Sequence, residues 1–226
     1  MSVLPSRVRG PFRPAFDPRR PHGWERFGCG EPVVGARPGD FLLSHRTWHP
    51  FSVLIRIGQR LRIRGDDHRD YCHWSHAALV TTEDGALVEM QKPGAVRGHV
   101  DDYRDLDCVL VRVHATEGDR AQAVEFAEWC IAGERRIGRA AFLSLGLSCL
   151  TGSTFTFFHD GSMVCSALVA RAQERTGAIF NRDPNHIAPA DLAKYYGVRL
   201  DARRGPAEAL DGPPAAAASR HRSPVA

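Results

Sequence analysis

The chain has 226 residues, of which 43% are hydrophobic and 25% charged, and this composition is typical of one globular domain with polar ends. The formal net charge is only +4, and neither interleaved aromatic and basic residues nor a known binding motif is present, so we predict no nucleic-acid partner. The six cysteines include no C-x-x-C pair, which argues against a zinc ribbon and a thioredoxin motif.

Both ends of the chain have the composition of disordered segments. Residues 1–30 are rich in arginine and proline, and residues 201–226 are rich in alanine, proline and arginine. One globular domain is therefore expected over residues 31–200. The N-terminal segment lacks an apolar stretch followed by a small-residue cleavage site, so we predict no secretion signal, a cytoplasmic location and reduced cysteines.

The first elements of the domain are a predicted strand and a predicted helix. The strand spans residues 40–44, after the break at Pro38-Gly39. The helix starts at Pro50, because proline is favourable in a first helical turn, and its apolar residues are expected to face the core. The residues expected to face inward are Phe51, Leu54, Ile55 and Gly58, with Arg56 and Arg60 outward.

Two short apolar runs around a Glu-Asp-Gly turn at residues 83–85 predict a β-hairpin. Opposed residues of an antiparallel pair point to the same face of the sheet. A loop of two or four residues would therefore place Glu89 opposite Ala78 or Val80, on the face of His76. A three-residue loop would place Glu89 on the other face.

Further elements follow in the second half of the chain. Strands are predicted near residues 95–100 and 107–113, and a helix capped by Thr116 or Asp119 runs to about Gly133. In the second strand Val109, Val111 and Val113 fall on one face, as a sheet packed against helices requires.

The segment of residues 140–158 contains nineteen residues without a charge, but it also contains six serines or threonines and two glycines. Its length would allow a transmembrane helix, whereas its polar content favours a buried connection or one that lines a cleft. We therefore predict no stable membrane span. If the substrate is a lipid, its acyl chains would lie against this segment.

Cys165 is the candidate nucleophile, because it falls in the first turn of a predicted amphipathic helix. Asp160 or Ser162 would cap that helix, and Gly177 would end it. A helix N-terminus stabilises a thiolate, which is the reactive form of cysteine. The same residue lies on a stripe with Leu168, Val169 and Ala172, so it could instead be a core residue.

A base and an orienting acid for Cys165 are available in the predicted hairpin. If the helix packs against the hairpin face that carries His76 and Glu89, the three side chains have the arrangement of nucleophile, base and orienting residue found in cysteine hydrolases.

Five short motifs occur in a particular order along the chain, over roughly residues 35–200. They are Gly39-Asp40-Phe41-Leu42-Leu43, Trp74-Ser75-His76-Ala77-Ala78-Leu79, Val88-Glu89, Val164-Cys165-Ser166-Ala167-Leu168-Val169-Ala170 and Ile187-Ala188-Pro189-Ala190-Asp191-Leu192. In this order the chain resembles the circularly permuted papain-like hydrolases of the NlpC superfamily, in particular the YiiX-like branch, in which the histidine precedes the cysteine. A tyrosine that some relatives carry shortly before the cysteine is replaced here by Phe157, Phe158 and His159.

The resemblance implies an α+β papain-like fold, with an antiparallel sheet packed against helices and the catalytic cysteine at a helix N-terminus. It implies Cys165 as nucleophile, His76 as base and Glu89 as the third polar residue of a cysteine peptidase or amidase. The acyl substrate would be a small molecule, a peptide or a lipid-like compound. The alternatives are a lipid acyl hydrolase or acyltransferase of the lecithin retinol acyltransferase-like type, or a non-catalytic binding module that retains the fold.

Four further residues are candidates for substrate binding, namely His159, Trp74, Ser166 and Asp40. His159 stands six residues before Cys165 and could line a cleft. The backbone N–H of Ser166 could contribute to an oxyanion hole, although the N–H of Cys165 itself is the preferred donor. Asp40 is equally compatible with a structural hydrogen-bond partner at a strand start.

We predict neither a metal nor another cofactor. The closest candidate ligand pair is Cys72 and His76, which on an extended strand would lie about 13 Å apart, too far to share one ion. The sequence leaves the oligomeric state open.

Overall fold

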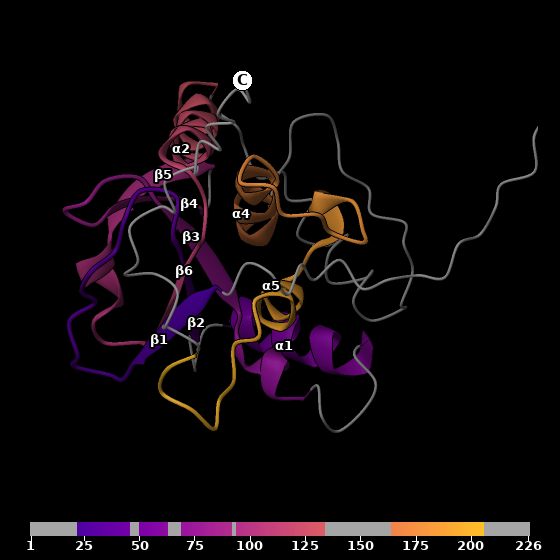
Figure 1. Ribbon diagram of the computed structural model, residues 1–226. Helices are drawn as coiled ribbons and strands as arrows, with labels where there is room; N and C mark the ends of the chain where they lie inside the picture. Colours follow the sequence, from indigo (N-terminus) through magenta and orange to yellow (C-terminus); the bar gives the residue numbers. More distant parts are fainter. Residues whose placement is uncertain (1–21, 46–49, 63–68, 92–93, 134–163, 206–226) are drawn as a thin grey trace, which may run out of the picture.

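A computed structural model describes residues 22–45, 50–62, 69–91, 94–133 and 164–205 of the chain (Figure 1). Their strands form one sheet in the order β1-β6-β2-β3-β4-β5, and every neighbouring pair is antiparallel. The strands are β1 (Gly23–Phe27), β2 (Phe41–His45), β3 (His76–Val80), β4 (Ala86–Met90), β5 (Ala95–His99) and β6 (Asp107–Arg112). The α-helices are α1 (Pro50–Arg62), α2 (Glu117–Ala132), α4 (Cys165–Glu174) and α5 (Pro189–Tyr195), and the 3-10 helices are η2 (Asp70–His73), η3 (Val100–Tyr103) and η4 (Pro184–His186). The chain is thus an α+β protein, as predicted.

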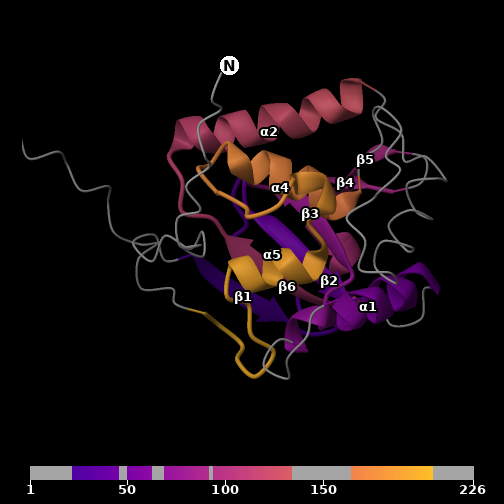
Figure 2. The ribbon, with the colours of Figure 1, turned by 90° about the vertical axis from the view of Figure 1, so that its right-hand side faces the viewer.

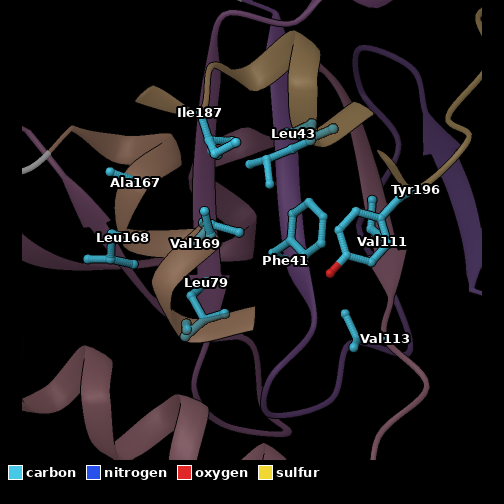
Figure 3. Packing of buried hydrophobic residues seen from close by; sticks show 14 of the residues in the cluster. Phe41, Leu43, Leu79, Val111, Val113, Ala167, Leu168, Val169, Ile187 and Tyr196 are labelled. Atoms are coloured by element: carbon cyan, nitrogen blue, oxygen red, sulfur yellow. The ribbon is translucent and has the colours of Figure 1, made fainter. Parts of the chain in front are cut away.

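The α-helices lie on one side of the sheet (Figure 1), and α4 and α5 stand in front of the strands when the molecule is viewed from that side (Figure 2). The main hydrophobic core fills the space between the two layers. Side chains from the strands and from α4 interlock there, and Ile187 and Tyr196 complete the packing beside α5 (Figure 3). Val109, Val111 and Val113 all belong to this core, which confirms their predicted common face.

The opposite face of the sheet is also covered. Leu42, Ala78 and Leu87 pack there against Val33 and Tyr103, which come from the loop after β1 and from η3. A strand that is buried on both faces carries apolar residues almost continuously. This explains why β2 and β3 read as short unbroken apolar runs in the sequence.

The structure corrects the predicted limits of the domain. Strand β1 lies inside the N-terminal segment expected to be disordered, yet it pairs with β6 and buries Trp24 and Phe27. The C-terminal segment also packs, because the carbonyl of Arg203 accepts a hydrogen bond from the N–H of Arg26 at 2.8 Å. The predicted boundaries at residues 30 and 201 were wrong because composition averages over a segment, whereas two large apolar side chains suffice to anchor an edge strand.

The β3–β4 hairpin has the register predicted for a loop of even length. Ala78 lies opposite Glu89, so Glu89 and His76 share a face. Gly85 in the turn has a φ of 97°, and a Cβ at that position would lie 2.6 Å from the side chain of Val100. Glycine is therefore required at the turn that sets this register.

Helix α1 begins at Pro50, as predicted, but it is rotated relative to the prediction. Gly58 is buried, as expected, whereas Leu54 belongs to a group of exposed aliphatic side chains. The buried face carries Ser52 and Gln59 instead. The apolar pattern indicated the wrong face because the buried hydrogen bonds of the Gln59 amide determine the orientation of this helix.

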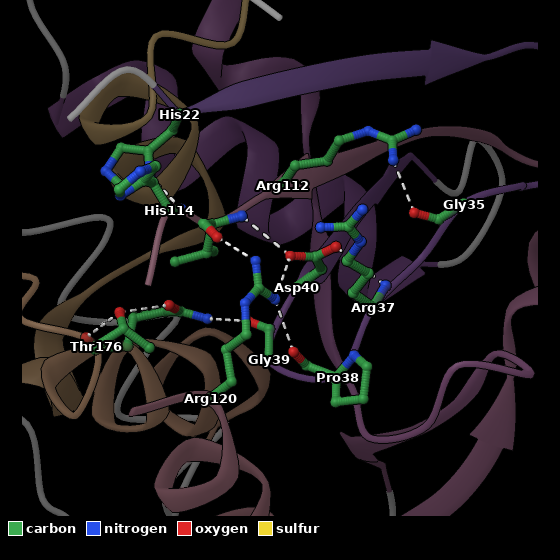
Figure 4. A network of polar contacts seen from close by, with 12 residues as sticks. His22, Gly35, Arg37, Pro38, Gly39, Asp40, Arg112, His114, Arg120 and Thr176 are labelled. Atoms are coloured by element: carbon green, nitrogen blue, oxygen red, sulfur yellow. Dashed lines mark hydrogen bonds and ion pairs between the residues drawn. The ribbon is translucent and has the colours of Figure 1, made fainter. Parts of the chain in front are cut away.

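A buried ion pair holds the start of β2 (Figure 4). The carboxylate of Asp40 accepts hydrogen bonds from the guanidinium of Arg120 at 2.9 Å and from the N–H of Val113 at 3.0 Å. Gly39, just before the strand, has a φ of 87°, and a Cβ there would lie 3.2 Å from the Arg120 side chain. Asp40 therefore ties β2 to the start of α2 and has a structural role.

Among the helices that the structure describes, none has both the length and the apolar composition needed to cross a membrane. The uncharged segment of residues 140–158 lies outside the described residues, so its predicted place in a cleft stays a prediction.

Candidate active site

Helix α4 has Cys165 as its first residue. Its N-cap is Val164, which has an extended backbone and makes no side-chain hydrogen bond to the helix. The predicted caps, Asp160 and Ser162, lie outside the described residues and do not occupy the N-cap position. The first N–H groups of a helix have no acceptor within the helix, and here the cap residue supplies none either. These N–H groups can therefore bind a negative charge beside the sulfur.

Cys165 differs from the other members of its apolar stripe. Leu168, Val169 and Ala172 are fully buried, whereas Cys165 is partly exposed although it packs against the core. The helix ends at Glu174, and the turn that follows it closes at Gly177, whose φ of 86° is left-handed as predicted. The Cys165 side chain is therefore held in a fixed place and is also accessible to a substrate, and a nucleophile requires both.

The β3–β4 hairpin brings the predicted base and acid together, on the sheet face that carries Ala78 and Leu87. Helix α4 packs against the other face of the sheet, so the predicted packing of this helix against the face of His76 is wrong. Cys165 instead meets His76 where the helix and the strand begin.

His76 Nε2 lies 2.5 Å from Glu89 Oε2, and the side chains are only 16% and 4% exposed. This contact fixes the orientation of the imidazole ring. Because Nε2 is held by Glu89, Nδ1 is the ring nitrogen that is left to bind the sulfur of Cys165.

Two further side chains, which the sequence did not single out, hold the Glu89 carboxylate. The hydroxyl of Tyr103 donates to Oε2 at 2.8 Å, and the amide of Gln91 donates to Oε1 at 2.8 Å. Gln91 stands two residues after Glu89, on the same side of the extended chain, so strand alternation could have suggested it. Tyr103 comes from η3 on the buried opposite face of the sheet, and no local sequence pattern indicates this contact.

The Glu89 carboxylate is kept ionised despite its burial. Burial alone would raise the pKa of Glu89, but the hydrogen bonds from His76, Tyr103 and Gln91 and the charge of His76 lower that pKa to about 2. A permanent negative charge thus lies against the imidazole. It favours the protonated form of His76.

Cys165 and His76 stabilise each other's charged forms. Burial disfavours the imidazolium, but the charge of the Cys165 thiolate and the hydrogen bonds to Cys165 and Glu89 raise the pKa of His76 to about 10. Burial likewise raises the pKa of the Cys165 thiol, but the charge and hydrogen bond of His76 lower it to a greater extent. The pair therefore favours a thiolate beside an imidazolium.

Two backbone N–H groups also donate to the sulfur of Cys165 and lower its pKa, namely those of Ala77 and Ser166. Ala77 can do so because the ladder between β3 and β4 begins one residue later, where Ala78 lies opposite Glu89. The N–H of Ser166 belongs to the first turn of α4. The start of β3 and the start of α4 thus meet at the sulfur.

The other predicted substrate-binding residues have structural roles or lie outside the described part. Ser166 donates its hydroxyl to the carbonyl of Ile187 at 2.6 Å, and Asp40 is paired with Arg120. Trp74 is fully buried. All three side chains are buried in the interior, whereas the predicted contribution of the Ser166 backbone N–H to an oxyanion hole stays a prediction. His159 lies outside the described residues.

A second histidine–carboxylate pair lies near the same end of the sheet. His73 Nε2 is 2.7 Å from Asp107 Oδ2, and Arg26 donates to both oxygens of Asp107 at 2.8 and 2.7 Å. The ring of His45 stacks on that of His73 with 4.0 Å between the ring centroids. The side chain that binds the carboxylate of this second pair is thus the cation Arg26, and no nucleophile among the described side chains takes part.

In the part of the chain that the structure describes, no group of three or more histidine, cysteine or acidic side chains is placed to hold a metal ion. Searches against protein-family models, curated proteins and solved structures found no match to this chain. The geometry of the site is that of a cysteine, a histidine and a carboxylate in contact with one another at a helix N-terminus.

Proposed function

We propose that the protein is a cysteine hydrolase that cleaves an amide bond, with a papain-like fold in permuted order. The observation that carries the proposal is the contact chain from Glu89 through His76 to Cys165, in which the buried carboxylate holds one nitrogen of the imidazole and leaves the other to the sulfur. A cysteine placed only for packing has no need of a histidine that is oriented by a buried acid.

In the proposed reaction the Cys165 thiolate attacks the acyl carbon and forms a tetrahedral intermediate. The N–H groups at the start of α4 stabilise its oxyanion. The imidazolium of His76 then gives its proton to the leaving amine, the C–N bond breaks and a thioester is left on the sulfur. In the second half His76 takes a proton from water, the hydroxide attacks the thioester, and the C–S bond breaks. The carboxylic acid leaves, and the thiolate of Cys165 and the imidazolium of His76 are restored. Glu89 keeps the ring oriented throughout.

The test is a screen of acyl amides and acyl esters with the wild type and with Cys165→Ala, followed by intact-mass measurement. The proposal expects a mass increase equal to the acyl group on the wild type at short times and none on Cys165→Ala. Product formation that survives in Cys165→Ala would contradict the proposal, because no thioester could then form.

One observation favours a second candidate function, the hydrolysis or transfer of lipid acyl groups. Helix α1 exposes four aliphatic side chains and packs against η2, which leads through Trp74 to His76. Long-chain esters belong in the same screen for this reason. A preference for them over short-chain amides would select this second function.

A further inference from the structure

Helix α1 turns its apolar side to solvent and its polar side to the core. Val53, Leu54, Ile57 and Leu61 are between 38% and 55% exposed, and their spacing places them on one stripe of the helix. Ser52 and Gln59, on the opposite side, are 6% and 0% exposed. A surface helix of a globular protein normally has the reverse arrangement.

The inverted orientation is fixed by the amide of Gln59. Its Nε2 donates to the carbonyl of Trp74 at 2.9 Å, and its Oε1 accepts from the N–H of Ala190 at 2.9 Å. Rotating the aliphatic stripe inward would break both buried hydrogen bonds and leave four polar groups unpaired, which is costly in a protein interior. The exposed stripe, which we call the α1 stripe, is therefore a built feature of the fold.

The charges of α1 are all positive. Its sequence contains Arg56, Arg60 and Arg62 and no acidic residue. Burial and the neighbouring charge of Arg60 lower the pKa of Arg56, and Arg56 Nε is buried without a hydrogen-bond partner among the described residues. Two cations next to each other without an acid on their own helix would be stabilised by an anionic surface.

The small size of the α1 stripe indicates what kind of partner it can bind. Four side chains on one helix are far fewer than the roughly 20 to 30 residues that each partner of a stable protein complex contributes. Aliphatic side chains combined with arginines on one helix are instead typical of helices that lie in the plane of a bilayer. Figure 2 shows α1 at the edge of the helical layer.

We propose that α1 binds the surface of an anionic lipid bilayer, with the α1 stripe at the boundary of the acyl chains and the exposed Arg60 against the headgroups. Each basic residue near such a surface adds to the binding energy, and the contribution weakens as salt screens it. Because α1 packs against η2 just before β3, this contact would hold the start of β3 close to the bilayer.

The experiment is co-sedimentation of the full chain with lipid vesicles made of phosphatidylcholine with or without phosphatidylserine. We expect the wild type to sediment with the phosphatidylserine vesicles, and the double variant Ile57→Gln/Leu61→Gln to bind them at least about tenfold more weakly, because a buried aliphatic group contributes strongly. Arg60→Gln should weaken binding about fivefold and reduce its salt dependence. The matched control is Val34→Gln/Ile179→Gln, which changes two aliphatic side chains that are 58% and 70% exposed elsewhere on the molecule, and it should bind like the wild type.

Three outcomes would overturn the proposal. They are no sedimentation of the wild type, equal binding of the wild type and Ile57→Gln/Leu61→Gln, and equal binding to vesicles with and without phosphatidylserine. A concentration-dependent dimer that the double variant abolishes would assign the α1 stripe to a second copy instead. Circular dichroism and thermal unfolding of each variant establish that it is folded. Cys165→Ala should bind vesicles like the wild type, so this proposal and that of hydrolysis fail independently.

Discussion

Two histidine–carboxylate pairs near one end of the sheet differ in their third member. His76 contacts Glu89 at 2.5 Å and His73 contacts Asp107 at 2.7 Å, so the two contacts alone are nearly equivalent. In the first pair Glu89 also accepts hydrogen bonds from two uncharged side chains, Tyr103 and Gln91. His76 of this pair contacts the sulfur of Cys165. The acid of the second pair is bound by the guanidinium of Arg26.

The difference shows that a histidine beside an acid is not sufficient to define a site. In the second pair Arg26 and His73 together hold the pKa of Asp107 well below its usual range, against the effect of burial, and the cluster joins β1, η2 and β6. In the first pair the charge of Glu89 is compensated mainly by His76, and the imidazolium can in turn compensate a thiolate. We therefore assign the first pair to chemistry and the second to stability.

The strongest test of the difference between the two pairs is to remove the candidate nucleophile. Cys165→Ala should lower the turnover of any amide substrate by at least about a thousandfold, because no acyl-enzyme can form. Cys29→Ala, which alters an exposed cysteine elsewhere, should leave turnover unchanged. Residual activity of Cys165→Ala within tenfold of the wild type would refute the assignment of the first pair.

The next largest effect is expected from the two histidines. His76→Asn should lower kcat/KM by roughly a hundredfold or more, because it removes the general acid and base. His73→Asn should instead lower the free energy of unfolding by about 1–3 kcal/mol, because the hydrogen bond between His73 and Asp107 is lost. Steady-state kinetics and chemical unfolding of both variants separate the two roles. A large loss of activity in His73→Asn, with only a loss of stability in His76→Asn, would contradict the assignment.

A smaller loss is expected from Glu89→Gln, which keeps the shape of the side chain and removes its charge. Turnover should fall about ten- to a hundredfold, since the imidazolium loses its ionic partner. The ionised Glu89 stabilises the fold above its ordinary pKa of 4.5, and this contribution is lost as the pH falls toward about 2. The difference in unfolding free energy between the wild type and Glu89→Gln should therefore narrow over that interval. A difference that does not change with pH would show that the pKa of Glu89 is the same in the folded and the unfolded chain.

The smallest effect is expected from Tyr103→Phe, which removes one hydrogen bond to Glu89 and no charge. We expect a loss of about 1 kcal/mol in stability and an upward shift of the pKa of Glu89, because the carboxylate loses a donor. Acid titration of Glu89 by NMR measures this shift directly. An unchanged titration would mean that Tyr103 only fills space.

The local geometry of the site follows from patterns that the sequence displays. The turn at Gly85 fixes the hairpin register, and the period of an extended chain then places Glu89 on the face of His76. The position of Cys165 at a helix start follows from the apolar spacing after it. These are short-range features, and each depends on a few adjacent residues.

Contacts between distant segments were not predictable in this way. The hydroxyl of Tyr103 reaches Glu89 from a 3-10 helix, and Trp24 anchors an edge strand within an arginine- and proline-rich segment. The orientation of α1 is set by two hydrogen bonds of Gln59 to Trp74 and Ala190, which lie 15 and 131 residues away in the chain. In each case a tertiary contact of a single side chain outweighs the local pattern, and only the folded chain brings the partners together.

The most direct test of the central assignment is the pH dependence of alkylation of Cys165. Native protein is treated with limiting iodoacetamide between pH 5 and 9, and each cysteine is followed by mass spectrometry. The imidazolium of His76 and the N-terminus of α4 both favour the thiolate and lower the pKa of Cys165, so Cys165 should be labelled first and already below about pH 7. In His76→Asn its labelling should move to higher pH. Cys165 labelled more slowly than the buried Cys72 and Cys130, or with the same profile in His76→Asn, would contradict the account.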